Sequence, residues 1–227
     1  MQLGAASHVA ALLDARRSKR AYLPTPVSDA LLRQLLQQAR QAPSGANLQP
    51  GCFHALQGQA RAGLSAALLQ AYQAGAQEAE DYDYFPMPLP SALKRRQVAA
   101  ARALYGAVGI AREDQAGRHA QFAQNFRFFD APVALVVTID QAWGKGGYLD
   151  LGMALYGLML AAQAQGLASC AIGALASYPG LIRQHLGLDA QQHVVCGLAL
   201  GYADPAAAVN TTVTERAPLD DYFRVLG

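Results

Sequence analysis

Apolar side chains lie on nearly every face of the helix predicted for residues 148–165. They are Leu149, Leu151, Met153, Leu155, Tyr156, Leu158, Met159 and Leu160. A helix that is apolar all round must be covered on all sides, either in a protein core or in a membrane. Its densest apolar run, residues 151–162, is shorter than the ~18 residues that indicate a membrane span. We therefore expect a covered helix in a folded, soluble protein, with Gly166 as the C′ residue that ends it.

Residues 132–139 are β-rich and apolar throughout, and residues 194–202 form a second apolar run. Uninterrupted apolar runs of this length predict strands that are buried on both faces. A shorter strand is expected at 52–57. Helices are expected at about 8–17, from 28 onward, at 60–77, 91–109 and 114–126, and in a short segment that Ser177 caps and Gly187 ends.

The second of these helices carries the clearest local signals. Ser28 is a plausible N-cap, and Val27 can pack on Leu32 as a hydrophobic staple. Residues 31–39 then form a one-sided apolar stripe, and the helix stops at the loop signal of residues 43–45. Because helices and strands alternate without a βαβ rhythm, we predict an α+β fold of three layers, with a central mixed sheet flanked by helices.

Residues 81–90 (DYDYFPMPLP) cannot form a helix, because they contain three closely spaced prolines. They predict an aromatic, proline-stiffened loop. Such a loop is either a surface connector or a wall over a binding site.

Charged residues make up 15% of the chain, against a typical ~25%, and the formal net charge is +2. This composition excludes a disordered chain and a nucleic-acid binder driven by counterion release. Asp14, Arg16 and Arg17 interrupt the early apolar stretch, so no signal peptide is expected. Cys52, Cys170 and Cys196 form no C-x-x-C pair, which favours free thiols in a cytoplasmic protein. No metal-ligand cluster is evident either.

The first candidate site is the basic run Arg16-Arg17-Ser18-Lys19-Arg20. Cations after a helix can simply favour the helix dipole, which is the ordinary interpretation. Guanidinium groups also bind phosphate oxygens in a bidentate way, and the serine hydroxyl adds a donor. In a chain with so few charges, the concentration of cations strengthens the interpretation as a phosphate site.

The second candidate is the loop Ala42-Pro43-Ser44-Gly45-Ala46-Asn47-Leu48-Gln49-Pro50. It can be an ordinary turn between a helix and a strand. It can also present backbone groups, together with Asn47 and Gln49, to the polar edge of a planar ring. No P-loop, no dinucleotide-binding glycine motif and no nucleophile elbow accompanies it.

Together, the basic run and this loop resemble the opening pattern of the nitroreductase family of FMN-dependent oxidoreductases. The resemblance continues, in the order of the family, through five further segments. They are residues 125–132, 143–152, 158–162, 194–204 and 210–219. It is strongest with the nitrobenzoate-reductase branch and covers nearly the whole chain.

The resemblance implies an intertwined homodimer with FMN at the subunit interface. Residues 1–203 would form the FMN-binding domain, and residues 204–227 an arm that docks on the partner subunit. The implied FMN contacts come from four parts of the chain. Arg16, Arg17 and Ser18 would hold the phosphate and ribityl chain, Arg20 would approach the pyrimidine edge, and Arg216 would add a second guanidinium to the phosphate.

The other implied contacts concern the flavin ring. Pro43, Ser44, Gly45 and Asn47, with Gln49 in the same loop, would cover it from the partner subunit. Ile172, Gly173 and Ala174 would line it near N5. Three residues depart from common family patterns. Gly51 stands where the family often has an aromatic residue, Ala171 where a proline is common, and Gly173 where some members have an acidic residue.

The implied reaction is a ping-pong NAD(P)H oxidation with nitroaromatic or quinone acceptors, in which no side chain acts as a nucleophile or an acid. Arg112 or Arg118 could pair with a carboxylate of the acceptor. The same scaffold could instead support reductive dehalogenation or enone reduction, or a flavin-binding protein without catalysis. The expected partners are a second copy of the chain and a small aromatic molecule, with no nucleic acid and no membrane.

Overall fold

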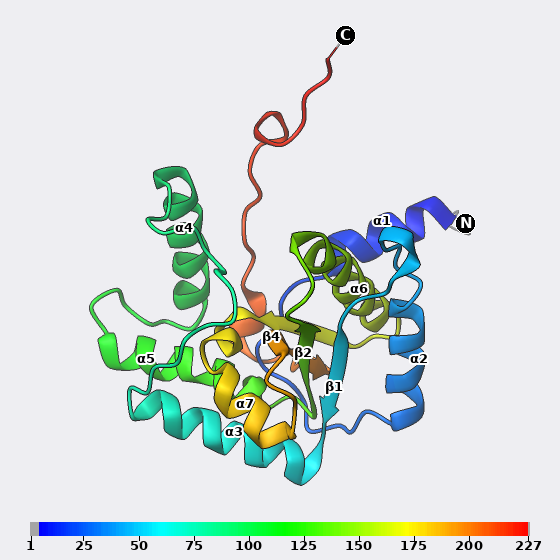
Figure 1. Ribbon diagram of the computed structural model, residues 1–227. Helices are drawn as coiled ribbons and strands as arrows, with labels where there is room; N and C mark the ends of the chain where they lie inside the picture. The colour runs from blue at the N-terminus through cyan, green and yellow to red at the C-terminus, as the bar shows by residue number, and fades with distance from the viewer. Residues whose placement is uncertain (1–4, 227) are drawn as a thin grey trace.

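The computed structural model describes residues 5–226 (Figure 1). In this range the chain forms seven α-helices and four β-strands. The helices are α1 (Ala5–Ala15), α2 (Asp29–Ala39), α3 (Gly58–Gln73), α4 (Ser91–Ala107), α5 (Gln115–Ala123), α6 (Lys145–Ala164) and α7 (Pro179–Leu186). The strands are β1 (Cys52–Leu56), β2 (Val133–Asp140), β3 (Ala168–Ile172) and β4 (Gln192–Gly201).

The strands form one sheet in the order β1-β2-β4-β3, and all three strand pairs are antiparallel. We expected a mixed sheet, and this prediction is wrong, because the four strands are all paired antiparallel. A parallel contact is found in an isolated bridge between Ser18 and Ser169. Strand β3 was not expected, because its five residues, Ala-Ser-Cys-Ala-Ile, are too few and too small to show a strand periodicity.

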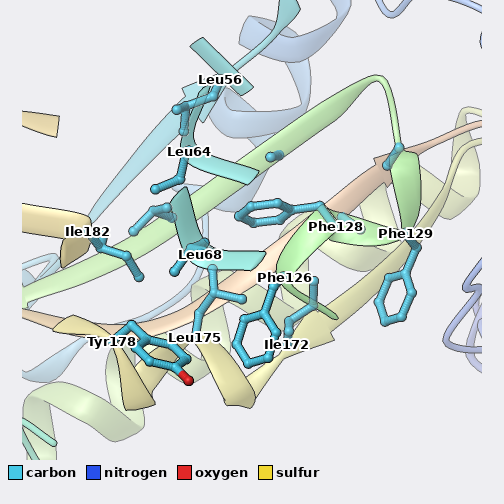
Figure 2. Packing of buried hydrophobic residues seen from close by; sticks show 14 of the residues in the cluster. Leu56, Leu64, Leu68, Phe126, Phe128, Phe129, Ile172, Leu175, Tyr178 and Ile182 are labelled. Carbon is cyan, nitrogen blue, oxygen red and sulfur yellow. The ribbon is translucent and has the colours of Figure 1, made fainter. Parts of the chain in front are cut away.

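Alternate residues of β2 point into two different cores. Val133 and Leu135 pack with Leu35 of α2 and Leu158 of α6, whereas Ala134 and Val136 pack with α3, α7 and the segment 124–130. Figure 2 shows the second of these cores, in which Leu64 and Leu68 of α3 meet Phe126, Phe128 and Leu175. A strand covered on both faces needs apolar residues on both of them, so the three-layer arrangement explains why β2 is apolar from Val133 to Val137.

Most expected elements are present, with bounds that differ by a few residues at the ends. Helix α1 ends at Ala15, so Arg16 and Arg17 lie outside it. Helix α5 ends at Ala123, and the chain continues as a 3₁₀ helix over Gln124–Asp130 in which Phe128 and Phe129 have positive φ values. Both rings are buried, and their packing holds a backbone conformation that non-glycine residues rarely adopt.

The two expected N-caps have opposite outcomes. Ser28 caps α2, because its Oγ accepts a hydrogen bond from the Leu31 N–H at 3.2 Å, and Val27 and Leu32 are buried in the same core cluster. Ser177 does not cap α7. Its hydroxyl donates to Glu80 at 2.7 Å, and the carboxylate of Glu78 accepts from the Gly180 N–H at 2.6 Å instead. A carboxylate is the stronger acceptor at a helix N-terminus, so a residue about 100 positions away replaces the local serine.

The long helix α6 is covered on only part of its circumference in the single chain. Leu151, Leu158 and Ala162 are buried, but Leu149 is 67% exposed and Tyr156 is 40% exposed. Leu149 and Tyr156 are seven residues apart, so they lie on one face of the helix. The apolar face of α6 that the sequence says must be covered is thus partly open, and α1 beside it exposes Val9 and Leu13.

The three cysteines are free, and they differ in burial. Burial raises the pKa of the Cys196 thiol to about 12 and raises the pKa of Cys170, whereas Cys52 is exposed. Since the thiolate is the reactive form, we expect iodoacetamide at pH 8 to modify Cys52 first and to leave Cys170 and Cys196 unmodified in the folded protein. Mass spectrometry of digested samples, with a urea-unfolded control in which all three react, measures this order. Equal rates at Cys52 and Cys196 in the folded protein would contradict it.

None of the described helices is long and apolar enough to span a bilayer.

Candidate functional site

The basic run leaves α1 as an extended segment along the edge of the sheet. Ser18 pairs with Ser169 of β3, and the Lys19 N–H donates to the Ser169 carbonyl at 3.2 Å. Ser169 precedes the end of β3 at Ile172 by three residues. The fold therefore brings the predicted phosphate-binding run next to the strand that leads into Ile172, Gly173 and Ala174.

Asn210, which is buried, fixes the position of this run. Its Oδ1 accepts from the backbone N–H groups of Arg20 (2.7 Å) and Ala21 (3.2 Å), and its Nδ2 donates to the carbonyls of Ala21 and Asp204. The Lys19 ammonium donates to the Asn210 carbonyl at 2.7 Å. A single amide thus joins the basic run to the start of the C-terminal arm, 190 residues away in sequence.

Arg16 has an incomplete set of hydrogen bonds. Its Nε is buried and has no hydrogen-bond partner among the described residues. Its guanidinium lies 5.9 Å from the ring centroid of Tyr156 on α6. A buried donor without a partner costs free energy, so this position fits an anionic group that accepts from Arg16.

The loop 42–50 is held in a compact, unusual conformation. The Gly45 N–H donates to the Asp150 carboxylate of α6 at 3.0 Å, and the Gln49 N–H donates to the Ser44 hydroxyl at 3.0 Å. Ala46, Asn47 and Gln49 all have positive φ values, which non-glycine residues rarely adopt. Pro43, Ser44 and Gln49 line a cavity of about 340 Å³ beside Arg40 and Cys52.

Gly51 follows this loop at a position that favours glycine. Its φ is +91°, and a Cβ there would lie 2.5 Å from a methyl group of Leu151. A side chain at this position would therefore require a strained backbone conformation and movement of the Leu151 side chain.

Gly173 and Ala174 line a second cavity, of about 740 Å³, with the aromatic residues Tyr84, Phe122 and Tyr178. A Cβ at Gly173 would lie within 2.9–3.1 Å of the Tyr84 ring and hydroxyl. Tyr84 therefore takes the space that a side chain at position 173 would need. The loop 81–90 is thus a wall over the predicted flavin-lining segment, one of the two alternatives that the sequence left open.

This wall is attached to the body by a short series of polar contacts. Asp81 accepts from the Arg183 guanidinium at 2.6 Å and from the Val194 N–H at 2.8 Å. The Tyr82 hydroxyl donates to the Val195 carbonyl at 2.6 Å, and burial raises the pKa of Tyr82. Because Asp81 and Tyr82 are bound to β4 and α7, Tyr84 is held against Gly173 rather than left on a free loop.

The single chain does not bring all the predicted site residues together. Gly173 and the loop 42–50 line different cavities. Arg216 lies on the exposed arm, and its guanidinium donates to Thr214 and Glu215 of the same arm. Figure 1 shows this arm extending away from the body beyond the short turn at Ala208–Thr211.

Four residues that position the site were not singled out as site residues from the sequence. They are Asn210, Tyr84, Asp150 and Glu78. Each acts across a long sequence separation, so no local spacing signal could have found it. For Tyr84, the aromatic composition of residues 81–90 was the only local signal. The described residues contain no group of three or more His, Cys, Asp or Glu side chains that could hold a metal ion.

The site combines a basic segment, a glycine- and serine-containing loop and an aromatic wall. Burial raises the pKa of Tyr84 above its ordinary value, so its hydroxyl stays protonated at neutral pH. Such an arrangement can hold an anionic group and a planar ring, and it depends on a bound cofactor for redox chemistry.

Comparison with known proteins agrees with these features. The model of the nitroreductase family matches residues 13–202. The chain is 38% identical to a 4-nitrobenzoate reductase of Pseudomonas putida, over 96% of this chain and 95% of that protein. It is 36% identical to a chloronitrobenzene nitroreductase of Comamonas testosteroni, over 93% of each.

Solved structures show the same fold. The FMN- and NADPH-dependent nitroreductase NfnB from sphigopyxis sp. strain HMH superposes with a TM-score of 0.93 at 38% identity, covering 96% of this chain and 99% of that one. The FMN-dependent nitroreductase NfnB of Mycobacterium smegmatis, solved in complex with NADPH, gives a TM-score of 0.92 at 30% identity, with 98% and 100% covered. The matched segment contains the basic run, the loop 42–50 and the strand that leads to Gly173, and on this evidence the chain belongs to the nitroreductase family.

Proposed function

We propose that the protein is an FMN-dependent NAD(P)H oxidoreductase that reduces nitroaromatic compounds. The observation that carries this proposal is the buried Nε of Arg16, which has no hydrogen-bond partner in the described part of the chain and lies at the start of a basic run along β3. The similar proteins that are named as nitrobenzoate and nitrobenzene reductases support the acceptor class.

The residues present fit FMN. Arg16, Arg17 and Ser18 would hold the phosphate and ribityl chain, because guanidinium groups bind phosphate oxygens in a bidentate way. Arg20 would contact the pyrimidine edge, and Ile172, Gly173 and Ala174 would lie against the ring. The chemistry that bound FMN supplies is the transfer of a hydride from a reduced nicotinamide to an electron-poor acceptor.

The protein's own part is to bind, to orient and to exclude water. The cavity beside Gly173 is lined by Tyr84, Phe85, Phe122 and Tyr178, so a planar aromatic acceptor can stack there. Since this one cavity would receive both the nicotinamide and the acceptor, the two would bind in turn, as in a ping-pong reaction. Quinones have the same planar shape and electron demand, and we include them as a second acceptor class.

We also propose that the active form is a homodimer. The single chain exposes 13530 Å², whereas a compact monomer of its mass exposes roughly 9,900 Å². The exposed faces of α6 and α1 and the arm beyond Thr212 carry large apolar side chains, including Leu149, Phe223 and Leu226. Obligate dimers bury such surfaces over ~2,000–5,000 Å².

A second copy would also complete the site. Pro43, Ser44, Gly45, Asn47 and Gln49 of one subunit would cover the flavin of the other. The arm that carries Arg216 would dock on the partner. Residues 204–212 pack on their own chain through Asn210, so the docking part would begin near Val213, later than the domain boundary at 204.

A spectrum and a reductive titration test the proposed function. We expect the purified protein to be yellow, with flavin absorbance that bleaches on anaerobic addition of NADPH or NADH and returns on addition of 4-nitrobenzoate. A yellow protein that never bleaches would indicate flavin binding without catalysis. Turnover of an enone or a halogenated aromatic, but of no nitroaromatic, would indicate a different reaction on the same scaffold. A colourless protein that cannot be reconstituted with FMN would contradict the cofactor assignment.

A further inference from the structure

A cavity of about 380 Å³ between α4 and the start of α5 brings three arginines together. Arg102 lies on α4, Arg112 on the connection between the helices and Arg118 on α5. Val98, Ala101, Arg102 and Tyr105 follow the i, i+3, i+4, i+7 spacing of one helix face, so α4 presents a single wall to the cavity.

Three cations share this cavity, and none of the described residues that line it carries a negative charge. The ion pairs and side-chain hydrogen bonds among the described residues do not involve Arg102, Arg112 or Arg118. Of the two carboxylates that follow Arg112 in sequence, Glu113 does not line the cavity, and Asp114 is occupied as the cap of α5, where it accepts from the Gly117 N–H at 2.8 Å. Three unpaired guanidinium groups repel one another, and a bound anion would relieve that repulsion.

Arg118 is oriented for such a ligand. Its guanidinium carbon lies 4.1 Å from the centroid of the Tyr105 ring. This stacking fixes the plane of the guanidinium and leaves its N–H edges free, which is the geometry that binds phosphate or carboxylate oxygens.

The cavity adjoins the proposed active site without being part of it. α4 contributes Gln97 to the aromatic cavity beside Gly173 and Val98 to the arginine cavity, but the two share no lining residue. From Gln97 to Arg102 the helix rises by about 7.5 Å. A small aromatic acceptor in the first cavity would therefore not fill the second, whereas a dinucleotide is long enough to enter both.

We propose that the cavity formed by Arg102, Arg112 and Arg118 binds the 2′-phosphate of NADPH and gives the enzyme a preference for NADPH over NADH. The inference rests on the proposed function, because it identifies which nicotinamide dinucleotide that function uses. A phosphate monoester carries close to two negative charges and three acceptor oxygens, which matches three guanidinium groups better than a single carboxylate does.

The first test is equilibrium binding, which needs no catalysis. The probes are adenosine 2′,5′-bisphosphate and adenosine 5′-monophosphate, titrated calorimetrically into the purified protein. We expect the bisphosphate to bind at least tenfold more tightly, and the double variant Arg102→Gln/Arg112→Gln to weaken it by about 10–100-fold. Arg95→Gln, which removes an exposed cation of α4 outside the cavity, is the matched control and should retain the affinity. Equal affinity for the two probes, or equal affinity in wild type and double variant, would overturn the proposal.

The second test is steady-state selectivity. The ratio of kcat/KM for NADPH to that for NADH should fall by about 10–100-fold in the double variant and in Arg118→Gln, and should not change in Arg95→Gln. If the variants instead raise KM for 4-nitrobenzoate relative to nitrobenzene and leave the nucleotide ratio intact, the cavity binds an acceptor carboxylate and the phosphate assignment is wrong. An enzyme that reduces nitroaromatics without phosphate selectivity would refute this inference and leave the proposed function standing. Selective binding of the bisphosphate by a protein whose flavin never bleaches would support the phosphate site and contradict the proposed function.

Discussion

Replacement of both Arg16 and Arg216 by alanine is expected to weaken FMN binding by about 10²–10⁴-fold. Each arginine would lose a charge-assisted hydrogen bond to the phosphate, worth about 1.5–3 kcal/mol, and 1.4 kcal/mol corresponds to a factor of ten. The buried Nε of Arg16 has no partner among the described residues, which is why its loss is expected to have the larger effect. Fluorescence titration of apoprotein with FMN measures the change.

The two single variants and a control separate the contributions. Arg33→Ala removes an exposed cation from α2 and should leave the Kd for FMN within twofold of wild type. Arg216→Ala should act only in the assembled dimer, because in the single chain this guanidinium donates to its own arm. A double variant that binds FMN as tightly as wild type would rule out the phosphate assignments.

Leu149→Asp is expected to convert the proposed homodimer into monomers. The side chain is 67% exposed in the single chain and lies on the open face of α6, seven residues from Tyr156. A carboxylate placed in an apolar interface must be desolvated without a partner, a cost of several kcal/mol in each of two symmetry-related positions. Light scattering coupled to size-exclusion chromatography measures the mass.

The same variant tests whether the site needs the second subunit. If Pro43–Gln49 of the partner cover the flavin, the monomer should also lose FMN during purification. Gln34→Asp, an exposed position on α2, adds the same charge outside the proposed interface and should remain dimeric. A Leu149→Asp protein that stays dimeric and yellow would place the interface elsewhere; a circular dichroism spectrum like that of wild type would show that the variant has folded.

Elements with strong local patterns were predictable from the sequence. The apolar runs of β2 and β4, the one-sided stripe of α2 with its Ser28 cap and the Gly166 terminus of α6 are all present in the structure. In each case the determining interactions lie within a few residues, or the pattern reports directly on burial.

Elements that depend on distant contacts were not predictable. Strand β3 forms because β4 and the segment at Ser18 are available to pair with it, not because Ala-Ser-Cys-Ala-Ile favours a strand. Ser177 loses the cap of α7 to Glu78, and α5 ends early because Phe128 and Phe129 are drawn into the core. Tertiary packing overrides local preference at all three places.

The basic run and the loop 42–50 could be recognised in the sequence because an uneven charge distribution and a dense set of turn residues are local properties. The sequence alone also required that α6 be covered, since its composition leaves no polar face. Only the tertiary structure showed that Asn210 holds the basic run on the sheet, that Tyr84 takes the space above Gly173, and that Arg102, Arg112 and Arg118 share one cavity. These relations join residues that are far apart along the chain or lie on different elements, and no local pattern encodes a distance between elements.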